Sequence, residues 1–264
     1  MELDDSVGQI VNFVKSNNIS ENTVIIFTSD NGPWLFECNM AGSMGPYQGL
    51  WQKQQGGGGS TGKMSTWEGG HRVPFIISWP GKLNPMVSDE LVSGLDILPT
   101  FAHLANFTLP TDRAFDGLAF PFIKPHEGLR TLLIQDKDLI EIWAVRYGQY
   151  KIFYGTRPNA DCAGSSGKGF MYHNPALVFD LHNDPAESTN IFLDFEIYHN
   201  VEEIKNEMRK SIESDLKSEP NWKDDPSAIP CCNSAHEFCS CESPKEDSNE
   251  FRRVFNQVFS LWAA

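Results

Sequence analysis

The stretch Thr23-Val24-Ile25-Ile26-Phe27-Thr28-Ser29-Asp30-Asn31-Gly32-Pro33 decides the fold class. Its first six residues form a continuous β-branched and aromatic run, which predicts a strand buried on both faces of a parallel sheet. Just upstream, apolar residues recur at helical spacing from about residue 3 to residue 16, so we expect an amphipathic helix there. A helix followed by a buried strand is one repeat of an α/β fold.

Further along the chain, residues 73–79 predict a second buried strand, and Asp96 is placed to cap a helix. From about residue 120 the pattern changes to strands that pair locally beside one long amphipathic helix. We therefore expect a small α+β subdomain with an antiparallel sheet. The predicted elements of this part are a hairpin of 140–145 with 150–154, a strand at 176–181 and a helix at 197–212.

These patterns predict three segments. Residues 1–118 form an α/β domain, residues 119–242 form the α+β subdomain, and residues 243–264 form a tail with apolar residues at helical spacing. The irregular stretch that follows Pro33 and ends near residue 72 is long for a compact domain, and such loops are often functional.

Composition excludes several classes of function. The formal net charge of −14 over 264 residues repels polyphosphate, so we expect no nucleic-acid partner. The sequence has no run of about 18 apolar residues, so we expect no membrane span. The acidic start, Met1-Glu2-Leu3-Asp4-Asp5, lacks the pattern of a signal peptide.

The cysteines favour an oxidising compartment. Four of the six cluster at Cys231, Cys232, Cys239 and Cys241, and two sequons place acceptor sites at Asn18 and Asn106. Zinc binding is an alternative for the cluster, but its spacing departs from that of structural zinc sites. We therefore predict two disulfides within the cluster, with their connectivity open, and a bridge between Cys38 and Cys162.

Two positions could bind a metal ion or an anion. Asp30 and Asn31 follow the buried strand directly, where ligands bind in open α/β sheets, and their oxygens suit Ca²⁺ or Mg²⁺. The alternative is an ordinary Asp-Asn-Gly-Pro turn. Lys63 precedes the second strand among glycines, where an ammonium can bind an oxygen of sulfate or phosphate. Its alternative is a solvated loop lysine.

Five motifs in order resemble the C-terminal part of the sulfatase family, over nearly the whole chain. They are Thr28-Ser-Asp30-Asn31-Gly-Pro33, Gly62-Lys63-x4-Glu68-Gly-Gly70-x-Arg72-Val-Pro74, Leu95-Asp96-Ile-Leu-Pro99-Thr100, Phe115-Asp116-Gly117, and Leu177-Val-Phe-Asp-Leu-His-Asn-Asp184-Pro185-x-Glu187. The resemblance implies the alkaline-phosphatase-like α/β fold of sulfatases with a smaller C-terminal subdomain. It also implies that Asp30 and Asn31 are calcium ligands and that Lys63 contacts the sulfate group.

The likeness is to the arylsulfatases, which implies hydrolysis of a sulfate ester in a lysosomal or secreted protein. A sulfated small molecule or a sulfated glycosaminoglycan is the implied substrate. Sulfatases use a formylglycine made from the cysteine of Cys-x-Pro-x-Arg, and none of the six cysteines lies in that context. The family's other metal ligands and active-site histidines also belong to its N-terminal half.

We therefore expect this chain to be part of a longer sulfatase and to be inactive by itself, with an incomplete Ca²⁺ ligand set and no catalytic residue. One alternative is a non-catalytic protein that acts by binding. Another is a phosphoryl-transfer relative, which the Glu68-Gly69-Gly70-x-Arg72 motif disfavours.

Overall fold

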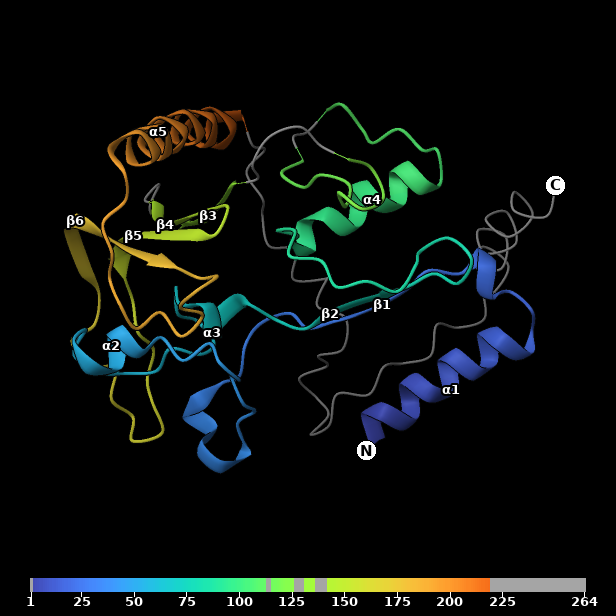
Figure 1. The fold of residues 1–264 in the computed structure, drawn as a ribbon, viewed down its shortest axis with the longest axis horizontal. Coiled ribbons are helices and arrows are strands. Elements are labelled where there is room, and N and C mark those ends of the chain that lie inside the picture. The colour runs from blue at the N-terminus through green and yellow to red at the C-terminus, as the bar shows by residue number, and fades with distance from the viewer. Residues whose placement is uncertain (1, 113–114, 126–130, 136–141, 219–264) are drawn as a thin grey trace, which may run out of the picture. The chain divides into compact units, whose positions relative to one another are not determined.

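The computed structural model (Figure 1) describes residues 2–112, 115–125, 131–135 and 142–218, and Met1–Lys217 form one compact unit. Its helices are α1 (Glu2–Ser16), α2 (Leu50–Gln54), α3 (Glu68–His71), α4 (Ile97–Leu104) and α5 (Phe195–Ser218), with short 3-10 turns at η1 (Ser20–Asn22), η2 (Leu35–Met40) and η3 (Gly94–Asp96). Its strands are β1 (Ile25–Thr28), β2 (Phe75–Ser78), β3 (Thr131–Gln135), β4 (Ile142–Tyr147), β5 (Tyr150–Thr156) and β6 (Met171–Asp180).

The two predicted strands of the first segment pair with each other, in a direction that the sequence did not indicate. β1 and β2 form a two-stranded antiparallel sheet, with Ile25 opposite Ser78 and Thr28 opposite Phe75. The expectation of a parallel sheet buried on both faces was wrong for the described residues: β1 is half-buried, and β2 alternates between half-buried and exposed side chains. A β-branched run specifies a strand, but the connection between two strands decides whether they pair in parallel or antiparallel. The segment between β1 and β2 is long enough to permit either direction.

The predicted antiparallel sheet of the later segment is confirmed. Its strand order is β3-β4-β5-β6, and each neighbouring pair is antiparallel. Gly148 and Gln149 connect β4 to β5, and Gly148 has φ +55°, a backbone conformation that favours glycine in tight hairpin turns. Strand β3 was not predicted from the sequence.

Both faces of this sheet are covered. On one face Ala144, Phe153, Leu177 and Phe179 pack with Trp67, which lies just before α3. On the other face Val145, Ile152 and Val178 pack with Val201 of α5, the long helix beside the sheet in Figure 1. The alternation of the two sets follows the period of two in a strand. Segments distant in sequence therefore enclose the sheet.

The helices agree with the sequence patterns, with one difference at Asp96. α1 and α5 lie where their apolar spacing predicts them. Asp96 is at the N-cap position of α4 but makes no side-chain cap there. Instead its carboxylate accepts hydrogen bonds from the backbone N–H groups of Ser93 (2.7 Å) and Leu118 (2.9 Å), so it fixes the preceding turn.

Some predictions fall beyond the described residues. The cluster of Cys231, Cys232, Cys239 and Cys241 lies outside them, as does the tail 243–264. The proposed boundary between residues 118 and 119 stays a prediction. Among the helices that the structure describes, none is long and apolar enough to cross a membrane.

Candidate functional site

The turn after β1 is held against α3 by backbone contacts. The N–H of Gly32 donates to the carbonyl of Gly70 (2.9 Å), and the N–H of Lys63 donates to the carbonyl of Pro33 (2.9 Å). Both α3 and the Lys63 segment that precedes it therefore meet the turn that follows Asp30 and Asn31. The backbones of the first motif, which contains Asp30 and Asn31, and of the second motif, which contains Lys63, are therefore in contact at this turn.

Glycine at position 32 makes this contact possible, and glycine at position 70 lets α3 pack on the residues just before it. A Cβ at Gly32 would lie 1.8 Å from the carbonyl oxygen of Gly69, and a Cβ at Gly70 would lie 2.6 Å from that of Ser65. Neither distance is sterically allowed, and backbone atoms cannot move aside as a flexible side chain can. Close packing of neighbouring backbone thus explains why the Glu68-Gly69-Gly70 motif contains glycine.

Asp30 and Asn31 lie at the end of β1, with the Asp30 side chain exposed and Asn31 half-buried. One carboxylate oxygen of Asp30 accepts hydrogen bonds from the Asn31 N–H (2.9 Å) and from the Ser29 hydroxyl (3.3 Å). Partial desolvation raises the pKa of Asp30, but these hydrogen bonds and that of its own backbone amide lower it overall. The carboxylate is therefore kept ionised and open to solvent.

Lys63 lies near this pair. Its positive charge also lowers the pKa of Asp30, and its Nζ lies 5.9 Å from the centre of the Trp34 ring. A second hydrogen bond fixes its backbone from the later segment, because the Asn159 side-chain amide donates to the Lys63 carbonyl (3.3 Å). Lys63 is half-buried, so its ammonium remains available to an anion. Its role and those of Asp30 and Asn31 stay predictions.

The donors fit a hard cation in kind but are few. Asp30 offers a carboxylate and Asn31 an amide oxygen, both of the type that Ca²⁺ prefers. Within the described residues, no group of three or more His, Cys, Asp or Glu side chains is placed to hold a metal ion. Because Ca²⁺ takes six to eight oxygens, these two residues could supply only part of its ligands.

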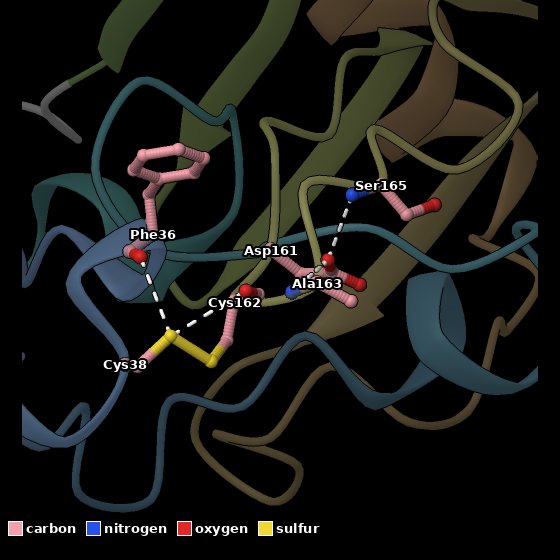
Figure 2. Close-up of a disulfide and its surroundings, with 6 residues drawn as sticks. All are labelled: Phe36, Cys38, Asp161, Cys162, Ala163 and Ser165. Atoms are coloured by element: carbon pink, nitrogen blue, oxygen red, sulfur yellow. Dashed lines mark hydrogen bonds between the residues drawn. A yellow bond between two sulfur atoms is a disulfide. The ribbon is translucent and has the colours of Figure 1, made fainter.

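A disulfide joins Cys38, just after this turn, to Cys162, the pairing predicted above (Figure 2). Their Cα atoms lie 4.9 Å apart. The loop around Cys162 is shaped by the carboxylate of Asp161, which accepts hydrogen bonds from the N–H groups of Ala163 and Ser165, each at 2.9 Å. The bridge ties the segment next to Trp34 to the connection between β5 and β6.

The two sequon asparagines are accessible. Asn18 follows α1 and Asn106 follows α4, both side chains are exposed, and both residues have positive φ values of 56° and 51°. Asparagine tolerates this left-handed conformation better than most residues, so each can end its helix. Glycosylation at either position stays a prediction.

The structure also contains a buried charge cluster, which we define as Glu68, Arg146, Lys151 and Glu187. Lys151 Nζ lies 2.9 Å from a Glu68 oxygen and 3.3 Å from a Glu187 oxygen, and Arg146 lies 3.4 Å from the other Glu68 oxygen. The sequence pattern gave none of these residues a role. Two signals were present: Glu68 and Glu187 lie in two of the five sequence motifs, and Lys151 lies within the apolar strand Tyr150-Lys151-Ile-Phe-Tyr154.

Two protein-family models match the chain. The model described as "Sulfatase" matches residues 1–107, and the model described as "C-terminal region of aryl-sulfatase" matches residues 129–241. Arylsulfatase G of the dog is 40% identical over 254 residues, covering 92% of this chain and 47% of that protein. Human arylsulfatase A is 33% identical over 203 residues, covering 72% of this chain and 38% of that protein. The chain thus spans about half the length of the curated relatives it matches.

Solved structures of sulfatases superpose on most of this chain. The sulfatase PsFucS1 from Pseudoalteromonas sp. superposes with a TM-score of 0.64 at 25% identity, covering 84% of this chain and 43% of that chain. A Bacteroides thetaiotaomicron protein, described as BT33336S-sulf in work on the metabolism of glycosaminoglycans, gives a TM-score of 0.53 at 28% identity, covering 82% of this chain and 43% of that chain. Over the residues that superpose, the chain shares the alkaline-phosphatase-like fold of these neighbours.

Proposed function

Because the chain belongs to the sulfatase family, we propose that it supplies part of the active site of a sulfuric ester hydrolase of the arylsulfatase type. Asp30 and Asn31 bind a divalent cation, Ca²⁺ by family resemblance, and Lys63 contacts the sulfate group. The observation that carries this proposal is that the turn after β1 is hydrogen-bonded both to α3, through Gly70, and to the Lys63 segment, through Pro33.

The electrostatics of these residues support their roles. An exposed carboxylate with a lowered pKa offers a full negative charge to a cation, while Lys63 offers a positive charge to an oxygen of the ester. A bound divalent cation supplies charge neutralisation of sulfate oxygens. The chain's own residues would place the sulfate group between two positive charges, the cation that Asp30 and Asn31 hold and the ammonium of Lys63. The glycine contacts fix the backbone of these residues.

We propose a sulfated small molecule or a sulfated glycosaminoglycan as the substrate, in a lysosomal or secreted protein. The Cys38–Cys162 disulfide and the two exposed sequon asparagines support a secretory route. The acidic chain would recognise a polyanion locally, through Lys63 and the bound cation. The work on glycosaminoglycan metabolism describes a related fold and supports the substrate class by analogy alone.

The metal and sulfate roles can be tested by binding. We expect residues 1–264 to bind Tb³⁺, a luminescent substitute for Ca²⁺, and Asp30→Ala to weaken that binding by at least about tenfold. Asp89→Ala, which removes another exposed carboxylate, is the matched control. Lys63→Met should abolish NMR shift changes on addition of inorganic sulfate, whereas Lys82→Met should retain them. Equal binding by Asp30→Ala and the parent chain would refute the metal role.

A turnover assay tests whether this polypeptide carries a nucleophile of its own. The 264 residues contain no Cys-x-Pro-x-Arg, so we expect this polypeptide alone to hydrolyse no 4-nitrocatechol sulfate, with or without Ca²⁺. The assay uses protein from a secretory host that also expresses the formylglycine-generating enzyme. Turnover that disappears in Lys63→Ala would contradict this expectation and would require another nucleophile.

A further inference from the structure

The buried charge cluster is built around a lysine with no access to solvent. Lys151 is fully buried, and so is Glu187, while Glu68 is 5% exposed. A buried ammonium is costly unless carboxylates and hydrogen bonds surround it, and removing one partner leaves the other charge uncompensated. The position of each member is therefore strongly constrained by the others.

The sheet itself creates the need for Glu68. Arg146 of β4 lies directly opposite Lys151 of β5 in the strand register, and like charges opposite each other destabilise a sheet. The Glu68 carboxylate enters between them and contacts both. Desolvation raises the pKa of Glu68, but the charge of Lys151 and its other cationic neighbours lower it to about 2, so this carboxylate is ionised.

Glu187 reaches the same place from the loop after β6. One of its oxygens accepts a hydrogen bond from the backbone N–H of Glu68 (2.9 Å), which is the first residue of α3. Its other oxygen lies 3.3 Å from Lys151 Nζ. The loop is also fixed by its backbone, because the N–H of Trp51 donates to the Glu187 carbonyl (2.9 Å). The cluster therefore holds the backbone of α3 as well as its side chain.

The other end of α3 holds the candidate site. The Gly70 carbonyl accepts the hydrogen bond of the Gly32 N–H, and Gly32 follows Asn31 directly. Because a Cβ at Gly32 would overlap the Gly69 carbonyl, the two backbones are in direct contact with no adjustable side chain between them. A shift of Glu68 is thus transmitted to Gly32 through a single short turn of helix.

We propose that Glu187 and Lys151 are positioning residues that fix Asp30 and Asn31 for the cation, by holding α3 from its first residue. This inference rests on the proposed function. It assigns to the C-terminal sheet a part in metal binding, although none of its described residues supplies a ligand in the proposal. Residues outside the ligand set that orient the ligands commonly affect metal affinity or activity.

The first test compares Tb³⁺ affinities at a temperature where circular dichroism shows each variant to be folded. Glu187→Ala removes the acceptor for the Glu68 N–H, and we expect it to weaken Tb³⁺ binding by about tenfold. Glu187→Gln keeps an acceptor oxygen there and should restore affinity to within about threefold of the parent chain. Lys151→Met should also weaken binding. Glu202→Ala, which breaks the Glu202–Lys205 ion pair of α5, is the matched control and should leave affinity unchanged.

The second test needs no metal. Hydrogen exchange of the Gly32 amide, followed by NMR, should be about tenfold faster in Glu187→Ala than in Glu187→Gln or Glu202→Ala. Parent-like Tb³⁺ affinity and Gly32 exchange in a folded Glu187→Ala variant would overturn the inference while leaving the proposed function intact. Loss of the metal role would instead appear as equal Tb³⁺ binding by the parent chain and Asp30→Ala.

Discussion

The two sheets of this chain differ in how they are covered. In the β3–β6 sheet, Phe153 and Ile152 are fully buried on opposite faces, one beneath Trp67 and the other beneath α5. In the β1–β2 sheet no strand residue is classed as buried within the described structure, and Ile76 is 61% exposed. The candidate ligands Asp30 and Asn31 follow the less covered sheet. The best-packed apolar core and the candidate ligands therefore lie in different parts of the molecule, so apolar truncations and ligand substitutions should have different effects on stability.

The largest contrast is expected between two apolar truncations. Phe153→Ala should lower the free energy of unfolding by about 3–5 kcal/mol, because it empties a packed aromatic position among Trp67 and Phe179. Ile76→Ala should cost less than about 1 kcal/mol, because most of its side chain is already in water. Urea denaturation followed by circular dichroism measures both. Similar losses would show that the β1–β2 sheet is as well packed as the other.

Removal of the disulfide should have the next largest effect. The bridge spans 124 residues of sequence, so the double variant Cys38→Ser with Cys162→Ser should lose about 2–4 kcal/mol of stability. The same denaturation experiment measures the loss, with the reduced parent chain as a second sample. A double variant as stable as the oxidised parent would mean that the two segments are held by their other contacts alone.

Titration of Glu187 in the charge cluster should make the stability of the chain depend on pH. Desolvation and the nearby Glu68 raise the pKa of Glu187 to about 7 from a usual value of 4.5. Its contribution is therefore full below pH 4.5 and is lost as pH rises through 7, by about 1–3 kcal/mol. Desolvation and the charge of Lys151 lower the pKa of His71, so the titration of His71 changes stability with pH in the opposite direction to that of Glu187. Solvent around the exposed His71 side chain reduces this contribution. The measure is thus the difference between the parent chain and Glu187→Gln at pH 5 and pH 8. A constant difference would exclude titration of Glu187.

The smallest effect on stability is expected at the candidate ligands. Asp30→Asn keeps the size of an exposed side chain, so without metal it should change stability by no more than about 0.5 kcal/mol. With Tb³⁺ present, the parent chain should gain thermal stability and Asp30→Asn should gain less, because a ligand that binds the native state stabilises it. A large loss without metal would place Asp30 among the structural residues.

Periodicity predicted what depends on local sequence. The spacing of apolar residues located α1 and α5, and the runs 140–145 and 150–154 located the β4–β5 hairpin, although β4 extends to Tyr147 and the turn is shorter than predicted. The direction in which β1 pairs with β2 depends on a distant segment, which no local pattern reports. The same is true of the contact between Glu68 and Lys151, which are 83 residues apart in the sequence. The candidate ligands Asp30, Asn31 and Lys63 were found through their motifs. Glu68 and Glu187 also lie in sequence motifs, but nothing in those motifs indicates that they meet Lys151 and hold α3. The buried Lys151 shows why: its partners are known only once the chain is folded.

The Cys38–Cys162 bridge would keep the chain covalently joined after a cut in the backbone between these two cysteines. The loop between β2 and η3 lies within the segment that the bridge encloses, and nearly all of its side chains from residue 81 to residue 90 are exposed, as in segments that proteases cleave. A cut there would leave two pieces joined through sulfur. Such a molecule would migrate as one band on a non-reducing gel and as two after reduction. The bridge would keep the piece that carries Asp30, Asn31 and Lys63 joined to the piece that carries Lys151 and Glu187.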